Sequence, residues 1–272
     1  MGWSKIKNII ILLLVIVNVS LLVMVGQRYW RNEQNQRETR QRVIAMMEKN
    51  EISFLPAEVP GELELTGRRV ALEPPGEAEA AQLAGELTGH RTVGARTTWE
   101  GTRGTVTVSA SGELEAALKG AYPPETADMT AQGLELLASL GFQARYTGRE
   151  EQGDDTVLRY VQLWDGAPVP EWTAELTWGT EGLEHLSLRR LAGTEETMAG
   201  EETIDAATAL ARFLEALNRE GYVCSQVTNL YAGYAATGTG TVTLRPTWYV
   251  ETDTSPWRFA IDGVTGTVTA VE

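Results

Sequence analysis

A long uncharged run near the amino terminus constrains this chain more than any other feature of its sequence. The residues from Ile9 to Val25 are apolar except for Asn18 and Ser20. At about 1.5 Å of rise per residue, a helix over this run approaches the roughly 30 Å thickness of a bilayer hydrocarbon core. A single segment crosses that core only as a helix, because its backbone N–H and C=O groups must pair internally. We therefore predict a transmembrane helix at residues 9–27.

The flanks of the run favour an uncleaved anchor over a cleaved signal peptide. Trp3 precedes the run and Tyr29 and Trp30 follow it, at the spacing of the two headgroup zones where amphipathic rings gather. The run is long for the apolar region of a signal peptide, and no small-residue cleavage motif follows it.

The charges on either side leave the orientation of this helix open. Lys5 and Lys7 precede it, whereas five arginines and only two glutamates lie between residues 28 and 42. Taken literally, the positive-inside rule favours a cytoplasmic C-terminal domain, although long domains translocate largely regardless of charge. We expect a short cytoplasmic tail at residues 1–8 and an extracytoplasmic C-terminal domain.

The remainder of the chain is strongly acidic. The first fifty of the 272 residues hold eight of the 23 Lys and Arg and three of the 37 Asp and Glu, which leaves 15 basic against 34 acidic side chains. Such a domain repels nucleic acid, whose binding requires phosphate neutralisation. Cys224 is the only cysteine, so no intramolecular disulfide can form, and we expect a small buried thiol there.

Residues 28–55 are predicted to form a helical stalk. The sequence up to Asn50 is rich in Arg, Gln and Glu and lacks Pro and Gly, and its apolar residues come late. The stalk is either a spacer that continues the anchor or a dimer seam, although no sustained heptad is present. Pro56 and the Pro60-Gly61 pair then mark a boundary.

Residues 56–124 have the pattern of a small α/β subdomain. We predict strands near Leu63–Leu65 and Val70–Leu72, a helix at 77–87, a hairpin across Gly101–Gly104 and a second helix at 111–119.

Residues 125–272 show one pattern twice, which predicts an α+β domain with antiparallel sheets and an internal duplication (125–200 and 201–272). Amphipathic helices at 131–140 and 206–220 each end at a Gly-aromatic pair. Strand-like segments follow each helix, at 144–147, 157–163, 172–178 and 183–191, and then at 223–230, 241–244, 247–251, 258–261 and 267–271. In the third of these segments Trp172 and Trp178 share a face, which favours a core position over a binding groove.

The sequence offers few groups for chemistry. His90 and His185 are the only histidines and have no metal-ligand spacing with Cys224. The Asp154-Asp155 pair lies in a polar loop, where carboxylates are usually just solvated, and no nucleophile, zinc or phosphate-binding motif occurs. We therefore expect no catalytic residue, no metal and no cofactor.

The anchor itself carries one candidate partner-binding face. Asn18 lies mid-membrane, where an amide is costly unless it bonds to a partner, although it could also be a tolerated polar residue. Leu14, Leu21 and Leu22 share its helical face and complete the predicted contact.

Several short motifs resemble the YycI/YycH family, single-pass accessory proteins of a bacterial two-component system. Trp3, Ser4 and Lys7 before the apolar run are similar to the opening of that family, and Lys49–Ser53 resembles the segment after its stalk. Gln162 with Gly166-Ala167-Pro168 resembles another of its units. The Leu244–Val250 and Ile261–Val268 segments resemble its ending, a pattern shared with PepSY-type domains, except that Asp262 stands where Asn is more usual.

This resemblance implies an extracytoplasmic domain and a helix that packs against a sensor histidine kinase, without catalysis. A paralogous YycH-like protein would be a further partner, besides the lipid bilayer. The alternative is a PepSY-like binding module for a secreted peptidase or cell-wall component. A cell-envelope enzyme is a third reading, with the least support from the sequence.

Overall fold

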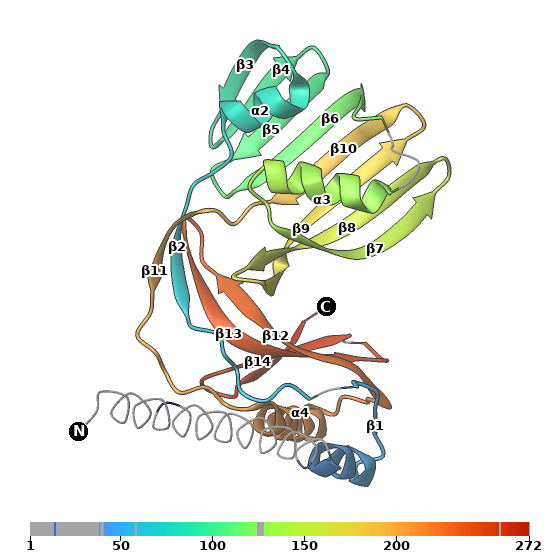
Figure 1. Cartoon of the computed structure of the whole chain (residues 1–272), viewed down its shortest axis with the longest axis vertical. Helices are drawn as coiled ribbons and strands as arrows, with labels where there is room; N and C mark the ends of the chain where they lie inside the picture. Colours follow the sequence, from blue (N-terminus) through green and yellow to red (C-terminus); the bar gives the residue numbers. More distant parts are fainter. Residues whose placement is uncertain are drawn as a thin grey trace, which may run out of the picture.

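The computed structural model describes residues 14, 38, 41–57, 59–123, 128–255 and 257–271, which form two lobes (Figure 1). The predicted transmembrane helix at 9–27 lies outside these residues apart from Leu14, which is helical and 55% exposed. Within the described ranges, no helix is both long enough and apolar enough to cross a membrane.

The upper lobe of Figure 1, called the inserted lobe here, is an antiparallel sheet with helices α2 (Glu77–Ala84) and α3 (Met129–Ser139) on one face. Its eight strands follow the order β3-β4-β5-β6-β10-β9-β8-β7. They are β3 (Leu87–Val93), β4 (Arg96–Gly101), β5 (Gly104–Ser109), β6 (Glu113–Ala121), β7 (Ala144–Gln152), β8 (Asp155–Trp164), β9 (Ala167–Gly179) and β10 (Gly182–Arg189).

The predicted helix at residues 111–119 is wrong, because most of this segment is strand β6. Leu114, Ala116 and Leu118 are buried and alternate with exposed neighbours, which is the period of a strand. β6 pairs with β5 on one side and β10 on the other. The Ala, Leu and Glu content favours a helix, but two hydrogen-bonded ladders and a buried face outweigh that propensity.

The other predictions for this lobe hold with shifted boundaries. The β4–β5 hairpin and strands β7–β10 are confirmed. Helix α3 starts at Met129, two residues before the predicted start at 131, because Asp128 caps it by accepting from the Ala131 N–H. Helix α2 ends at Ala84 instead of residue 87, where Gly85 turns the chain with a φ of 79°. Trp172 and Trp178 are 1% exposed, so their predicted core position is confirmed.

The lower lobe, called the terminal lobe here, is built on a seven-stranded sheet. Its strands are β1 (Ser53–Phe54), β2 (Arg68–Leu72), β11 (Gly193–Thr197), β12 (Gln226–Thr237), β13 (Thr241–Thr252), β14 (Arg258–Asp262) and β15 (Val268–Val271). Among the strands of this sheet that the structure describes, only β1 pairs in parallel, with β12. The predicted strand near Leu63–Leu65 is wrong: this segment is irregular, and Leu63 is buried in the core instead.

Helix α4 (Ala206–Glu220) has the predicted bounds and covers one face of this sheet. Asp205 caps this helix by accepting from the Thr208 N–H at 2.8 Å, and Gly221 ends it in the left-handed conformation with a φ of 75°. A further helical segment at 41–49 packs into the same core, where Val43 and Met47 are 1% and 0% exposed. The last part of the predicted stalk is therefore built into the terminal lobe.

Strand β13 joins two segments that the sequence separated at Arg245-Pro246. Residues 241–244 pair with β2, residues 247–251 pair with β14, and Pro246 lies between these two partners. Proline has no N–H to donate, and here its carbonyl accepts from the Gly263 N–H at 2.8 Å. The proline is tolerated because it lies where β13 changes its neighbour on that side.

A helix followed by four consecutive antiparallel strands occurs three times in the described residues. The units are α2 with β3–β6, α3 with β7–β10, and α4 with β12–β15. The sequence pattern predicts only the second and third, because it indicates no strand at β3 and a helix at β6. The first two units share one sheet through the β6–β10 pair and one apolar core.

The chain order shows how the lobes are connected. β2 leads into the inserted lobe and β11 leads out of it, and these two strands pair with each other. The Glu73 N–H donates to the Ala192 carbonyl at 2.8 Å, so both crossings lie side by side. These crossings, near residues 73 and 192, lie elsewhere than the boundaries at 56, 125 and 201 that the sequence suggested.

Candidate functional site

The residues predicted to contact a partner lie almost entirely outside the described structure. Leu14 is an exposed helical residue, while Asn18, Leu21 and Leu22 are outside the described ranges. The geometry within the two lobes points instead to the contact between them.

The tip of the β8–β9 hairpin, which belongs to the inserted lobe, contacts the terminal lobe. Asp165 and Gly166 form its turn with φ values of 50° and 79°. The pairing jumps from Val161–Thr173 to Gln162–Val169, so β9 has extra residues and the tip leaves the sheet. This tip lies against β12, where Gly233 leaves room for the Pro168 carbonyl that a Cβ would meet at 2.6 Å.

An apolar layer joins the two lobes at this contact. It combines buried side chains of both lobes: Val70, Ala167, Val169, Trp172, Leu191, Tyr234, Val242 and Leu244. The Arg68–Asp165 ion pair, at 3.2 Å, crosses between the lobes beside it. At about 25 cal/mol per Å² of buried apolar area, a layer of this kind favours a defined arrangement of the lobes.

A polar and aromatic group borders this layer, and we call it the interlobe cluster. Its members are Arg145, Glu171, Tyr231, Tyr249, Glu251 and Arg258. Tyr231 and Tyr249 stack with their centroids 5.3 Å apart. The first two members belong to the inserted lobe and the other four to the terminal lobe.

The buried hydroxyl of Tyr249 links the lobes. It lies 3.3 Å from Glu171 Oε1 and 3.1 Å from the Tyr234 carbonyl. Burial raises the pKa of the Glu171 carboxyl above its ordinary 4.5. Hydrogen bonds from the Glu171 and Ala236 N–H groups and from the Tyr249 hydroxyl, and the charge of Arg258, only partly oppose this. Burial also raises the pKa of Tyr231 and of Tyr249, so both remain neutral hydroxyls at any ordinary pH.

Glu251 holds the opposite side of the cluster. Its carboxylate accepts from the Tyr231 hydroxyl and from the Asn229 side chain and pairs with Arg258 at 3.3 Å. Arg145 lies over the Tyr231 ring at 5.8 Å from its centroid. The cluster can therefore hold or release a proton, and it offers neither an activated nucleophile nor a paired acid and base.

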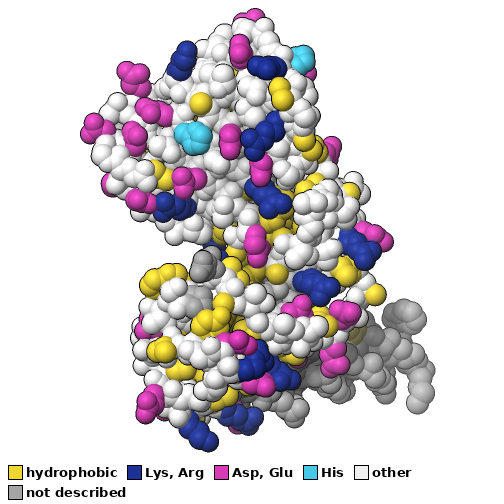
Figure 2. Space-filling view, turned by 180° about the vertical axis from the view of Figure 1, so that it is seen from behind, with side chains coloured by type: hydrophobic (Ala, Val, Ile, Leu, Met, Phe, Trp, Pro, Cys, Tyr) yellow, Lys and Arg dark blue, Asp and Glu magenta, His cyan; other side chains and the backbone are white. Residues whose placement is uncertain are grey.

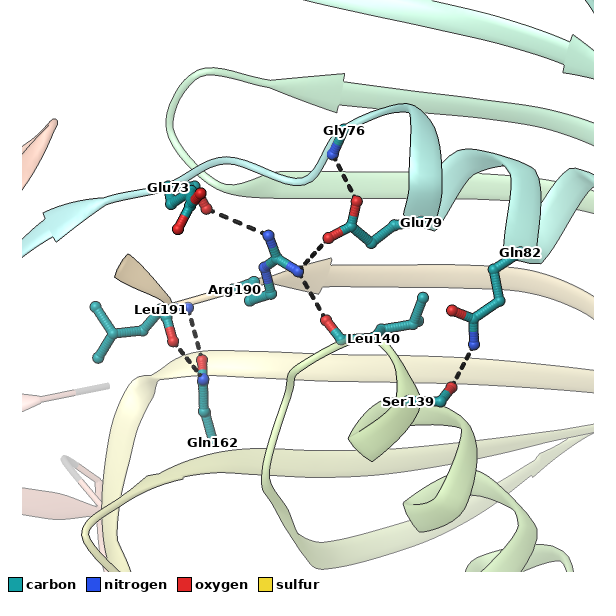
Figure 3. Close-up of polar contacts among 9 residues, drawn as sticks. All are labelled: Glu73, Gly76, Glu79, Gln82, Ser139, Leu140, Gln162, Arg190 and Leu191. Atoms are coloured by element: carbon teal, nitrogen blue, oxygen red, sulfur yellow. Dashed lines mark hydrogen bonds and ion pairs between the residues drawn. The ribbon is translucent and has the colours of Figure 1, made fainter. Parts of the chain in front are cut away.

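A second network fixes the point where the chain leaves the inserted lobe (Figure 3). The Arg190 guanidinium donates to Glu79 Oε1 at 2.6 Å and to the carbonyls of Leu140 and Glu73. It thus ties the first turn of α2 to the C-terminal end of α3. We call this group the Arg190 junction.

Gln162 completes this junction and gives a physical role to a residue that the family resemblance singled out. Its side-chain amide donates to the Leu191 carbonyl at 2.7 Å and accepts from the Leu191 N–H at 2.8 Å (Figure 3). Because Leu191 belongs to the apolar layer, Gln162 positions the lobe contact.

The other sequence candidates remain apart. His90, His185 and Asp154 are exposed, and the described residues contain no group of three or more potential metal ligands. Burial raises the pKa of the partly buried Cys224 thiol. Figure 2 shows the molecule from behind. Charged side chains of both signs are scattered over the inserted lobe, and hydrophobic side chains gather where the two lobes meet.

Sequence reasoning missed Glu171, Tyr231 and Tyr249 as a group. Glu171 belongs to a different predicted unit from the tyrosines, and only the hairpin packing brings them together. The available signal was weak: Tyr231, Tyr234 and Tyr249 occur within twenty residues of strand that is otherwise rich in Thr and Ala.

No sequence-family model and no curated protein matches this chain. An uncharacterized protein from Eubacterium rectale ATCC 33656 has a similar structure, with a TM-score of 0.53 and 12% identity over 76% of this chain and 86% of that one. The Bacillus megaterium YpeB C-terminal domain aligns with a TM-score of 0.38 and 11% identity over 74% of this chain and 100% of that one. At these identities the first likeness concerns the fold alone, and the second carries no further argument.

Proposed function

We propose that this chain is a non-enzymatic, single-pass membrane regulator of a sensor histidine kinase. In this proposal residues 9–27 anchor it, the two lobes lie outside the cytoplasm, and the Asn18 face packs against helices of the kinase. A paralogous YycH-like protein is the second partner that we propose for the lobes.

The observation that carries the proposal is the burial of the helical segment 41–49 in the terminal lobe. Val43 and Met47 are 1% and 0% exposed among side chains of α4 and the sheet. A segment held in a close-packed core moves with that core as one body. A displacement of the terminal lobe would therefore reach the chain that precedes residue 41, toward the proposed anchor.

The two-lobed arrangement supplies a means of biasing the anchor. The inserted lobe is connected by two paired crossings and one contact layer. Ligand or partner binding that changes this contact would shift the population of helix packings in the membrane.

Photo-crosslinking in living cells tests the proposal. A crosslinking residue at position 18 is expected to capture a histidine kinase, and a probe at Ile16, about 160° around the helix, is expected to capture it less. A scrambled apolar helix at 9–27 should abolish both capture and regulation. Equal capture from both positions, or full function with the scrambled helix, would contradict the kinase contact.

The alternative function is a PepSY-like extracytoplasmic binding module for a secreted peptidase or a cell-wall component. The feature that favours it is the folded body of two lobes with its own cores. Under this alternative, an unrelated apolar anchor leaves function unchanged, and the lobes capture their target without the kinase.

A further inference from the structure

We propose that protonation of Glu171 strengthens the contact between the inserted lobe and the terminal lobe, through the Tyr249 hydroxyl. This inference goes beyond the proposed function, because it concerns the two lobes alone and requires no kinase.

The argument starts from a shortage of hydrogen atoms at Tyr249. Its hydroxyl has one hydrogen, yet two acceptors lie within reach: Glu171 Oε1 at 3.3 Å and the Tyr234 carbonyl at 3.1 Å. A carbonyl and an ionised carboxylate both only accept. With Glu171 ionised, one of the two close oxygen pairs therefore has no hydrogen between its members.

A proton on Glu171 supplies the missing hydrogen. The Glu171 O–H then donates to the Tyr249 oxygen, and the Tyr249 O–H donates to the Tyr234 carbonyl. Both contacts are satisfied, and one of them joins β9 of the inserted lobe to β13 of the terminal lobe. Because Tyr249 is 0% exposed, water does not replace either bond.

The charges around Glu171 allow this protonation. The Glu171 and Ala236 N–H groups favour the ionised form, and so does Arg258 on β14, which is paired with Glu251 on β13; burial of the carboxyl outweighs them. Arg145 on β7 lies over Tyr231 on β12, and both tyrosines are neutral. The net effect is a pKa above 4.5, while the exposed part of the Glu171 residue lets protons exchange with solvent.

The sign of the pH dependence follows. Because the pKa of Glu171 is raised in the folded chain, its contribution to the lobe contact is complete below 4.5 and is lost as the pH rises through the raised value. Mild acid therefore tightens this contact, and neutral pH loosens it.

The test uses the full chain in detergent, with donor and acceptor dyes at Val93→Cys and Val223→Cys in a Cys224→Ser background. Both labelled positions are exposed, one in each lobe. Transfer efficiency is recorded from pH 4 to pH 8, and the Glu171 carboxyl is titrated by NMR. We expect the distribution of transfer efficiency to be narrower at acid pH. We also expect this change, and the titration of the Glu171 carboxyl, to have a midpoint above pH 4.5.

Three variants separate the proposal from general acid effects. Glu171→Gln keeps a hydrogen-bond donor at every pH, so its distribution of transfer efficiency should be narrow from pH 4 to pH 8. Tyr249→Phe removes the shared hydroxyl, so its distribution should not change with pH. Glu175→Gln changes a carboxylate on the same strand that pairs with Arg159, and it should behave as the wild type. An unaltered response in Glu171→Gln, or a Glu171 midpoint at or below 4.5, would overturn the proposal.

Discussion

The Arg190 guanidinium lies 2.6 Å from the carboxylate of Glu79, a residue 111 positions earlier in the chain. The pair joins the segment after β10 to the first turn of α2, and the same guanidinium also bonds the last turn of α3. Two helices of different units are thereby fixed at the point where the chain leaves the inserted lobe.

Replacing Arg190 by methionine is expected to destabilise the protein by about 3 kcal/mol, because Glu79 and two carbonyls lose their buried donor. Denaturant unfolding measures this loss. The Arg212–Glu215 pair, whose side chains are 53% and 60% exposed, provides the control. Arg212→Met should change the free energy of unfolding by less than about 0.5 kcal/mol; equal effects of the two variants would contradict a special role for the junction.

The Arg190 junction also predicts a pH dependence. Burial alone would raise the pKa of Glu79, but bonds from the Gly76 N–H and from Arg190 outweigh it and lower the pKa below 4.5. A lowered pKa means that the stabilisation is present above 4.5 and is lost as the pH falls through the lowered value. The difference in free energy of unfolding between wild type and Glu79→Gln should therefore shrink at acid pH. A difference that stays constant down to pH 3 would refute this assignment.

Gly133 is expected to resist substitution although it lies within α3. A Cβ there would lie 2.1 Å from the Tyr160 hydroxyl and 2.8 Å from its ring carbon. Alanine improves helix propensity by about 1 kcal/mol, but overpacking costs about 1–3 kcal/mol. We expect a lower melting temperature for Gly133→Ala and partial rescue by Tyr160→Phe in the same chain. Stabilisation by Gly133→Ala alone would show that α3 lies farther from β8.

Asp262 organises the turn between β14 and β15. Its Oδ1 accepts from the Val264 and Thr265 N–H groups at 2.9 and 2.8 Å. Asp262→Ala should cost about 1 kcal/mol, whereas Asp262→Asn keeps the acceptor and should cost less than half as much. Thermal unfolding of both variants measures the difference. Equal losses of stability in the two variants would mean that the negative charge of Asp262, which lies 3.4 Å from the Arg245 guanidinium, contributes more than its hydrogen bonds to the turn.

Much of the fold could be predicted where the signals are local. Helix α4 carries a strong apolar stripe, an Asp cap and a Gly terminator, and its predicted bounds match the structure. Strand β9 alternates, and an Asp-Gly and a Glu-Gly turn separate it from β8 and β10, so these strands could be predicted from the sequence.

The failures have a different cause. Residues 111–119 are compatible with a helix by composition, and only pairing with β5 and β10 makes them a strand. Pro246 reads as a strand end, and only the change of partner from β2 to β14 lets the strand continue through it. In β6, long-range hydrogen bonds outweigh a local preference worth less than about 1 kcal/mol per residue, and in β13 the proline falls at a position that pairs with neither β2 nor β14.

The helices with clear caps, the turns that need glycine, the acidic character of the folded part and the buried tryptophan face all follow from local sequence patterns. Three features follow from the folded chain alone: the third helix-and-strands unit, the insertion of one lobe between β2 and β11, and the contact of Glu171 with Tyr249 across the lobes. The reason is physical. Local signals depend on neighbours within a few residues, whereas these three features depend on contacts between distant segments: β6 with β10, β2 with β11, and Glu171 with Tyr249, which is 78 residues away in the chain.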